Sequence, residues 1–199
     1  NSLQDSQEKV RGVIKIATSF GVSSSFWFLR KLQKIIKKYP GLKIVVTDYK
    51  DGEIDSTTAD IFICPYSYGR ADLIQEKIID FKFRLYASSG YIKKNGKPKR
   101  FGDLDEHYLI SFPKELRNPF NDADSLLQMG RLSTNLRHIN LEVNSSIALV
   151  RLVEEGVGIA SLVEEEAIAK NLVPLFQEHE GKTISSCLTY KRKNKNFTN

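Results

Sequence analysis

A strand–helix–strand pattern across residues 140–162 constrains the fold of this chain more than any other stretch. Apolar residues alternate over Leu141–Val143, as at the end of a strand, and either Asn144 or Ser145 can cap the helix that follows. That helix has a broad apolar face until Gly156, in the position where helices commonly end in a left-handed conformation. A second, largely buried strand then follows. The helix start points free N–H groups and a positive dipole end beyond the first strand, although such caps also occur in plain packing.

A similar unit opens the chain. Residues 13–17 read as a buried strand, and apolar residues then recur at helical spacing between 28 and 39, with lysines at the other positions. Pro40-Gly41 ends this helix, and residues 42–47 form a second strand. A βαβ unit at each of two places predicts parallel sheets in an α/β fold.

The remaining elements are shorter. Further strands are expected at 59–64, 78–87, 108–112, 172–175 and 183–190, helical turns at 91–95 and 102–105, and a helix at 163–170. Residues 48–58 read as a polar connection, 66–70 as a loop, and 114–135 as loops with one helical turn near Leu126. Residues 1–11 are polar and resemble the tail of a helix or a linker.

Composition excludes several classes of protein. With 199 residues, 41% hydrophobic and 27% charged, the chain has the make-up of a globular protein with a real core. No apolar run approaches the roughly 20 residues of a membrane span, so no membrane partner is expected. Two cysteines, Cys64 and Cys187, are too few for a disulfide framework; we expect buried thiols and a reducing, cytoplasmic location. The net charge of +6 comes largely from residues 81–102 and 191–195, which we interpret as solvated surface.

The sequence carries no enzyme signature. His107, His138 and His179 stand far apart without metal-ligand spacing, and each is expected at the surface. The chain has no glycine-rich phosphate loop and no nucleophile elbow, and Glu164–Glu166 are explained by the dipole at a helix start. We therefore predict no catalytic residue, no metal and no cofactor.

The pattern instead predicts a ligand site. Hydroxyl and amide side chains stand between strand and helix in both βαβ units, and ligands of open parallel sheets bind beyond the carboxyl ends of the strands. If the two units face each other, they form a cleft for a small anion or polar molecule, and we favour a small carboxylate. Arg70 is expected to add a bidentate contact, with Tyr66 and Phe112-Pro113 as apolar walls or as ordinary loop packing. The predicted ligand-binding residues are Thr18, Ser19, Phe20, Ser23, Pro65, Tyr66, Arg70, Phe112, Pro113, Asn144, Ser145 and Gly158.

Several short motifs follow one another as in a known family. They are Gly12–Ser19, Tyr39-Pro40-Gly41, Ala59–Cys64, Tyr86–Tyr91, Gly96-Lys97-Pro98, Asp103-Leu104, His107, Val143–Ser146, Val153–Ala160 and Leu172–Leu175. In order and spacing, over residues 12–190, the chain resembles the effector-binding domain of LysR-type transcriptional regulators. One departure is that residues 48–58 lack the apolar helix of many members, which puts ligand contacts from that segment in doubt.

The resemblance implies a fold and a division of the chain. The fold would be α/β, with two Rossmann-like subdomains joined by two crossover strands, as in type II periplasmic binding proteins. Subdomain I would comprise residues 12–84 and 162–199, and subdomain II residues 85–161. Residues 1–11 would be the end of the linker helix, and the chain would stop short of the family's final helix.

The resemblance also implies a function. The chain would sense a small-molecule effector in the cleft and would act on DNA only through an N-terminal domain that this sequence lacks. The alternative is a free-standing solute-binding protein of the same fold class, which a true linker helix at residues 1–11 would disfavour. An enzyme on the same scaffold, similar to prephenate dehydratase or a deaminase, lacks a supporting catalytic set.

Association is the last expectation. Residues 26–29 are four consecutive large apolar residues, and one helix cannot point all four at a single core. We expect Trp27 at the flank of the buried face, unless a second layer of the same chain covers it. The resemblance implies a homodimer or higher homo-oligomer through this helix, with Trp27, Lys31 and Lys34 at the interface. In the second copy, the helix near 147–153 or its neighbours would contact it; the alternative is association through edge strands.

Overall fold

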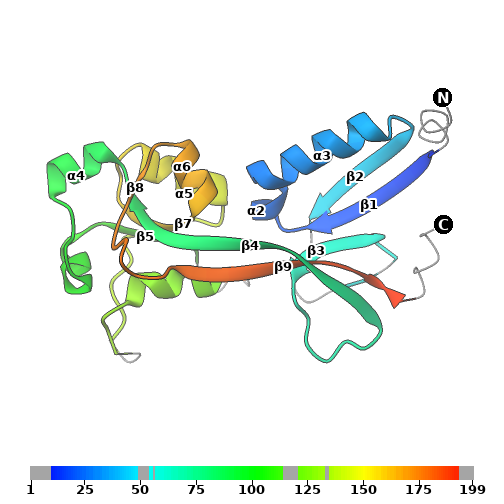
Figure 1. Cartoon of the computed structure of the whole chain (residues 1–199). Helices are drawn as coiled ribbons and strands as arrows, with labels where there is room; N and C mark the ends of the chain where they lie inside the picture. Colours follow the sequence, from blue (N-terminus) through cyan, green and yellow to red (C-terminus); the bar gives the residue numbers. More distant parts are fainter. Residues whose placement is uncertain (1–9, 49–53, 56, 114–120, 133–134, 193–199) are drawn as a thin grey trace. The chain divides into compact units, whose positions relative to one another are not determined.

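The computed structural model describes residues 10–48, 54–55, 57–113, 121–132 and 135–192. The chain divides into two compact units: unit 1 contains the residues up to 79 and from 185 onward, and unit 2 contains residues 80–184. Two strands, β4 (Leu73–Ala87) and β9 (Lys182–Lys191), begin in one unit and end in the other (Figure 1). The chain therefore has two crossover strands, as the resemblance implies.

Unit 1 is a parallel α/β unit. Its other elements are β1 (Gly12–Thr18), α2 (Phe20–Ser23), α3 (Phe26–Lys38), β2 (Leu42–Asp48) and β3 (Ile61–Pro65). The strand order is β2-β1-β3-β9, in which β1 is parallel to β2 and β3, and β9 is antiparallel to β3. The predicted βαβ opening is confirmed.

Helix α3 begins with a serine cap, and several of its large apolar side chains are exposed. The Ser25 hydroxyl accepts a hydrogen bond from the Phe28 N–H at 3.3 Å, which satisfies one of the free amides of the first turn. Phe28 is buried, whereas Phe26 and Leu29 are exposed and Trp27 is half-buried. The four apolar residues thus do not share one core, and Trp27 lies at the flank as expected.

The core of unit 1 lies around β3. Ala17, Ile54, Ala59, Phe62, Cys64 and Leu73 form one buried apolar cluster. Cys187 on β9 is also buried, so the expectation that both cysteines act as small buried hydrophobes is confirmed.

Unit 2 contains the other strand–helix–strand pattern. Its elements, besides parts of β4 and β9, are α4 (Ser89–Asn95), η1 (Phe101–Glu106), β5 (Leu109–Ser111), η2 (Asn121–Gln128), β6 (Leu141–Glu142), α5 (Ser146–Glu154), β7 (Ile159–Val163), α6 (Glu164–Ala169) and β8 (Val173–Pro174). The strand order is β4-β7-β5-β6, with β8 paired to β4. Both β6 and β7 are parallel to β5, so β6–α5–β7 is the predicted crossover unit.

Helix α5 holds the core of unit 2. Of the two candidate caps, the structure uses Ser145, whose hydroxyl accepts from the Ala148 N–H at 3.3 Å. Leu149 and Val153 are buried against Tyr86, Ile110, Ala160 and Leu162 of the sheet. The helix ends before Gly156, which has a φ of 77° as the sequence predicts.

A buried arginine ties the loops of unit 2 together. The Arg137 guanidinium donates to the Asp105 carboxylate at 2.7 Å and to the carbonyl oxygens of Leu127, Met129 and Phe101. These donors satisfy groups on η1, on η2 and on the turn after η2, which have little regular secondary structure of their own. This one side chain therefore links η1, η2 and the turn after η2 to one another.

The structure differs from the expectations in three places. The second crossover strand is β9, and residues 162–184, which the sequence analysis assigned to subdomain I, lie in unit 2 because β7 pairs with both β4 and β5. Strand β4 begins at Leu73 rather than Ile78. Residues 75–77 are polar, so the sequence shows no apolar alternation over the first part of this strand. His107 is half-buried rather than a surface residue. The expected linker helix falls on residues 1–11, of which 1–9 lie outside the described residues.

Candidate functional site

The strand ends of unit 1 bring several predicted residues to one edge. Thr18 ends β1 and pairs in register with Ile63, two residues before Pro65 ends β3. Because β1 and β3 are parallel, Thr18, Ser19, Pro65 and Tyr66 emerge at the same edge of the sheet. Phe20 and Ser23 are the first and last residues of the short helix α2 that follows. The structure thus brings Thr18, Ser19, Pro65 and Tyr66 to one edge of the sheet, and Phe20 and Ser23 follow in α2.

Not all of these side chains offer groups to a ligand. The Thr18 hydroxyl is buried and donates to the Ile63 carbonyl oxygen at 2.9 Å. The Ser19 hydroxyl accepts from the Val22 N–H at 3.4 Å and is only half-buried, so it keeps its own proton to donate. Tyr66 is half exposed, and its ring meets that of Tyr68 edge-on with 5.0 Å between centroids.

Arg70 is already engaged in an ion pair. Its Nε and Nη2 donate to the two carboxylate oxygens of Asp72, each at 2.9 Å. This hydrogen bonding lowers the pKa of Asp72 to about 2. The bidentate contact that the sequence analysis assigned to an effector carboxylate is thus made within the loop itself, and an effector would have to compete with Asp72 for it.

The strand ends of unit 2 bring a second group together. Phe112 and Pro113 follow β5, and Asn144 and Ser145 follow β6. The Val143 N–H donates to the Ser111 carbonyl oxygen at 3.0 Å, which joins the two strand ends. Asn144 is exposed and Ser145 is half-buried at the start of α5. These four predicted residues therefore share the carboxyl edge of this sheet.

Gly158 lies elsewhere. It precedes β7, whose Ile159 is in register with Leu109 at the beginning of β5, so Gly158 is at the amino edge of the parallel strands. A Cβ at this position would collide with the backbone carbonyl of Tyr108. The glycine is explained by this close approach of two strands, and the structure does not group it with the other predicted ligand residues.

Sequence reasoning missed a carboxylate beside Phe112. Asp124 of η2 accepts hydrogen bonds from the Ser111 hydroxyl at 2.7 Å and from the Phe112 N–H at 3.2 Å. Burial raises the pKa of Asp124 because the ionised form loses its hydration. No periodic signal marks this segment, which is why the residue was not found. Asp124 adds a carboxyl to the edge of unit 2 at which the sequence analysis expected amide and hydroxyl groups.

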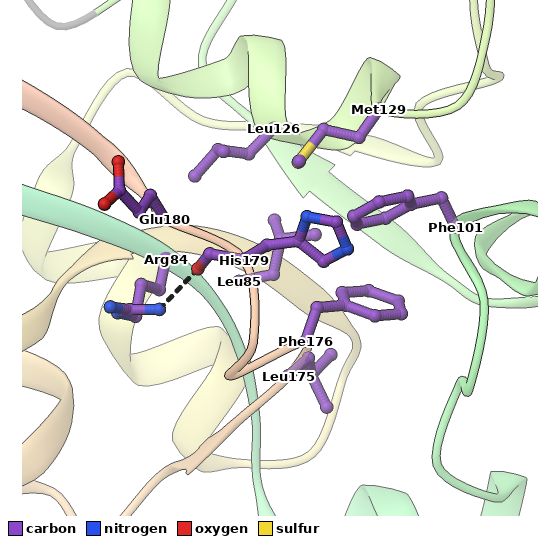
Figure 2. A pocket seen from close by; sticks show the side chains of 10 residues that line it. Arg84, Leu85, Phe101, Leu126, Met129, Leu175, Phe176, His179 and Glu180 are labelled. Carbon is purple, nitrogen blue, oxygen red and sulfur yellow. Dashed lines mark hydrogen bonds between the residues drawn. The ribbon is translucent and has the colours of Figure 1, made fainter.

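A small cavity lies within unit 2, and none of the residues that line it is among the predicted site residues (Figure 2). Figure 2 shows the rings of Phe101 and His179 close together beside Leu126 and Met129, and their centroids are 4.5 Å apart. The Arg84 guanidinium donates to the His179 carbonyl oxygen at 2.7 Å. With a volume of about 10 Å³, the cavity has room for about one water molecule. It is too small for an effector of ordinary size.

Two further findings concern the described residues as a whole. Among them, no group of three or more His, Cys, Asp and Glu side chains is arranged to hold a metal ion. No helix in this part of the chain is long and apolar enough to cross a membrane.

The architecture, two α/β units connected by two crossover strands, is that of the type II periplasmic-binding-protein-like fold. Residues 7–195 match the family model described as the LysR substrate binding domain. The chain therefore belongs to this family, which supplies the regulatory domain of LysR-type transcriptional regulators, and the resemblance seen in the sequence is confirmed.

Relatives agree with this assignment. The chain is 25% identical over 166 residues to the probable HTH-type transcriptional regulator SinR of Salmonella typhimurium, covering 80% of this chain but only 51% of that protein. The chain thus spans about half the length of this curated relative.

Solved structures agree on the fold. The regulatory domain of CrgA, a LysR-type regulator from Neisseria meningitidis, superposes with a TM-score of 0.74 at 20% identity, over 92% of this chain and 91% of that one. The regulatory domain of AphB in Vibrio vulnificus gives 0.71 at 22% identity, over 92% and 93%. At these sequence identities, the structural similarity supports the assignment of the fold and nothing further.

Proposed function

We propose that this chain senses a small-molecule effector, and that the effector binds at the carboxyl ends of the parallel strands in its two units. The observation that carries the proposal is the repeated arrangement of strand end, polar residue and capped helix. Ser19 in unit 1 and Asn144 with Ser145 in unit 2 follow strands that end at the edge of a parallel sheet. Membership of the family supports the same reading. Gly158 has no part in this site.

A small carboxylate remains the proposed chemical class. The first-turn amides of the nine-residue helix α5 carry the positive end of its dipole, which favours an anion by about 0.3–1 kcal/mol when exposed. Asp124 works against an anion when ionised, and its raised pKa limits this effect. Arg70 strengthens the site only if the effector replaces Asp72 as its partner.

A thermal-shift screen tests the proposal. Each carboxylate is paired with its neutral amide, because the two share a shape and differ in charge. A binder raises the melting temperature with the logarithm of its concentration over its dissociation constant, and we expect carboxylates to do so more than amides. Stabilisation by amides alone would refute the anion, and unchanged affinity in Arg70→Ala would remove Arg70 from the site. If no member of a broad screen stabilised the protein, effector sensing itself would be in question.

The regulator as a whole extends this proposal. We infer that the effector signal reaches DNA through a DNA-binding domain outside this chain, as the similarity to SinR suggests. A cytoplasmic location follows from that role and stays a prediction.

We further propose that two copies pair through α3. Leu29 and Ile36 are about half exposed, and α3 carries five basic residues and no acidic one. The segment from α5 to α6 carries five glutamates against one basic residue, Arg151, and Ile147 and Ile168 are exposed in it. A basic apolar face and an acidic apolar face are complementary, so α3 of one copy is expected to pack on α5–α6 of the other.

Successive helix residues are about 100° apart, so Leu29 and Ile36 lie on one side of α3, and Trp27, Lys31 and Lys34 lie on the opposite side. We place this contact on the side of Leu29 and Ile36, and we assign Trp27, Lys31 and Lys34 to a second contact surface of the same helix.

A further inference from the structure

The two cysteines of the chain lie opposite each other in the sheet of unit 1. Cys64 on β3 and Cys187 on β9 are register partners in an antiparallel pair. Directly opposite residues in such a pair have Cα atoms about 4.5–5.5 Å apart and side chains on the same face. A disulfide requires Cα atoms about 4.4–6.8 Å apart. The backbone therefore already has the spacing that a disulfide needs.

The side chain of Cys64 lies toward the correct neighbours. Its Sγ is 3.8 Å from the Thr189 hydroxyl oxygen on β9. Thr189 and Cys187 are two residues apart on one strand, so their side chains share a face. The Cys64 thiol thus lies against the row of β9 side chains that contains Cys187.

We propose that Cys64 and Cys187 form a disulfide across β3 and β9 when a hydroperoxide oxidises the protein. One thiol loses its proton and its sulfur attacks an oxygen of the hydroperoxide; the O–O bond breaks, the sulfur becomes a sulfenic acid, and the leaving alkoxide takes up the proton to become an alcohol, or water where the oxidant is hydrogen peroxide. The second thiol attacks the sulfenic sulfur, and its proton leaves with the displaced hydroxide as water. In sum, two thiols and one hydroperoxide give a disulfide, an alcohol and water.

Burial sets the rate of this reaction. Both thiols are almost fully buried, so the closed sheet excludes the oxidant. Oxidation must follow a local opening of β3 and β9, and conditions that favour opening must accelerate it. The pair is therefore a slow modification site, not a fast peroxidatic one.

The bond would constrain a strand that connects the two units. β9 leaves unit 2 at residue 184, three residues before Cys187. A covalent link to β3 would hold this strand in the sheet of unit 1. It would also lower the conformational entropy of the unfolded chain, which raises the melting temperature. This effect does not depend on the proposed effector.

The experiment counts thiols after oxidation. The reduced chain is treated with hydrogen peroxide, with and without urea below the unfolding transition, and is then alkylated under denaturing conditions. We expect a monomer with no alkylated thiol, a mass lower by two hydrogens, a raised melting temperature, reversal by dithiothreitol, and faster reaction in urea. The double variant Cys187→Ser with Leu188→Cys moves the second thiol to the opposite face, and it must keep two alkylatable thiols under the same conditions.

Three results would overturn the proposal. The first is a wild-type chain that keeps both thiols although hydrogen exchange shows that β3 and β9 open in urea. The second is oxidation to sulfinic acid or to a disulfide between chains. The third is equal disulfide formation in the register-shifted variant, because the bond would then come from unfolded molecules.

Discussion

Helices α3 and α5 start alike and are used differently. Each follows a parallel strand, begins at a serine cap and leads to another parallel strand. The nine residues of α5 bury Leu149 and Val153 almost completely, whereas Phe28 alone is fully buried among the thirteen residues of α3, all of which the structure describes. The same local signal therefore gives one helix, α5, that packs into a core and another, α3, that leaves apolar side chains exposed. We propose that these exposed side chains contact a second copy of the chain.

Truncating one leucine in each helix gives the largest contrast. Leu149→Ala removes a fully buried side chain and should lower the free energy of unfolding by about 2–5 kcal/mol. Leu29→Ala is the same change on α3, and it should lower the free energy of unfolding of the monomer by about 0.5 kcal/mol or less. Urea unfolding at low protein concentration measures both. Equal losses would end the distinction between the two helices.

A charge on the apolar surface of α3 gives the next largest effect. Leu29→Glu should weaken dimerisation at least about tenfold, because it places a carboxylate in the proposed contact. Trp27→Glu places the same charge at the edge of the buried face and tests whether Trp27 also belongs to the dimer interface. Gln177→Glu adds the same charge at an exposed position outside both α3 and the segment from α5 to α6, and it serves as the control. Sedimentation equilibrium at tens of micromolar decides the matter. A strict wild-type monomer, or a dimer that neither α3 variant weakens, would contradict pairing through α3.

Removing the caps should affect the two helices about equally. Ser25→Ala and Ser145→Ala each lose the hydroxyl that accepts a first-turn amide, and each should lower stability by about 1 kcal/mol. Ser145→Asn keeps an acceptor and should be nearly neutral. If Ser145→Ala were harmless but abolished effector binding, its hydroxyl would belong to the ligand rather than to the helix.

Two carboxyls, Asp124 in unit 2 and Asp72 in unit 1, should respond oppositely to pH. The raised pKa of buried Asp124 means that its contribution to stability is full below the ordinary carboxyl pKa and is lost as pH rises through the higher pKa of the folded state. Asp72, whose pKa is lowered to about 2, stabilises at neutral pH and loses its contribution in acid. The advantage of Asp124→Asn over wild type should therefore grow from pH 4 upward and then level off, as urea unfolding at several pH values will show. A constant difference would mean that Asp124 is not perturbed.

Local sequence signals predicted elements well where they were complete. The βαβ unit at the start and the β6–α5–β7 unit carried both periodicity and stop signals, and both are present. The sequence could not choose between Asn144 and Ser145 as the cap, because either oxygen suits the position and only the backbone geometry decides.

Features that depend on contacts between residues far apart in the sequence could not be predicted. The boundary between the units depends on β7 pairing with β4, which no local pattern reveals. Asp124 reaches Ser111 from a segment without periodicity, and Gly158 was read as a ligand residue when its role is a close approach to Tyr108. The pairing of Arg70 with Asp72 depends on the conformation of the loop between them, which the sequence does not show, so the prediction of a ligand contact for Arg70 missed it.

The central claim is that an effector binds at the carboxyl edges of both parallel sheets. Amide chemical shifts of the isotopically labelled chain, titrated with the best carboxylate from the screen, test it most directly. We expect the largest changes at residues 19–23 and 66 in unit 1 and at residues 111–112 and 144–146 in unit 2, with saturation at one dissociation constant. Changes confined to one unit, or centred on the small cavity around Phe101 and His179, would contradict it.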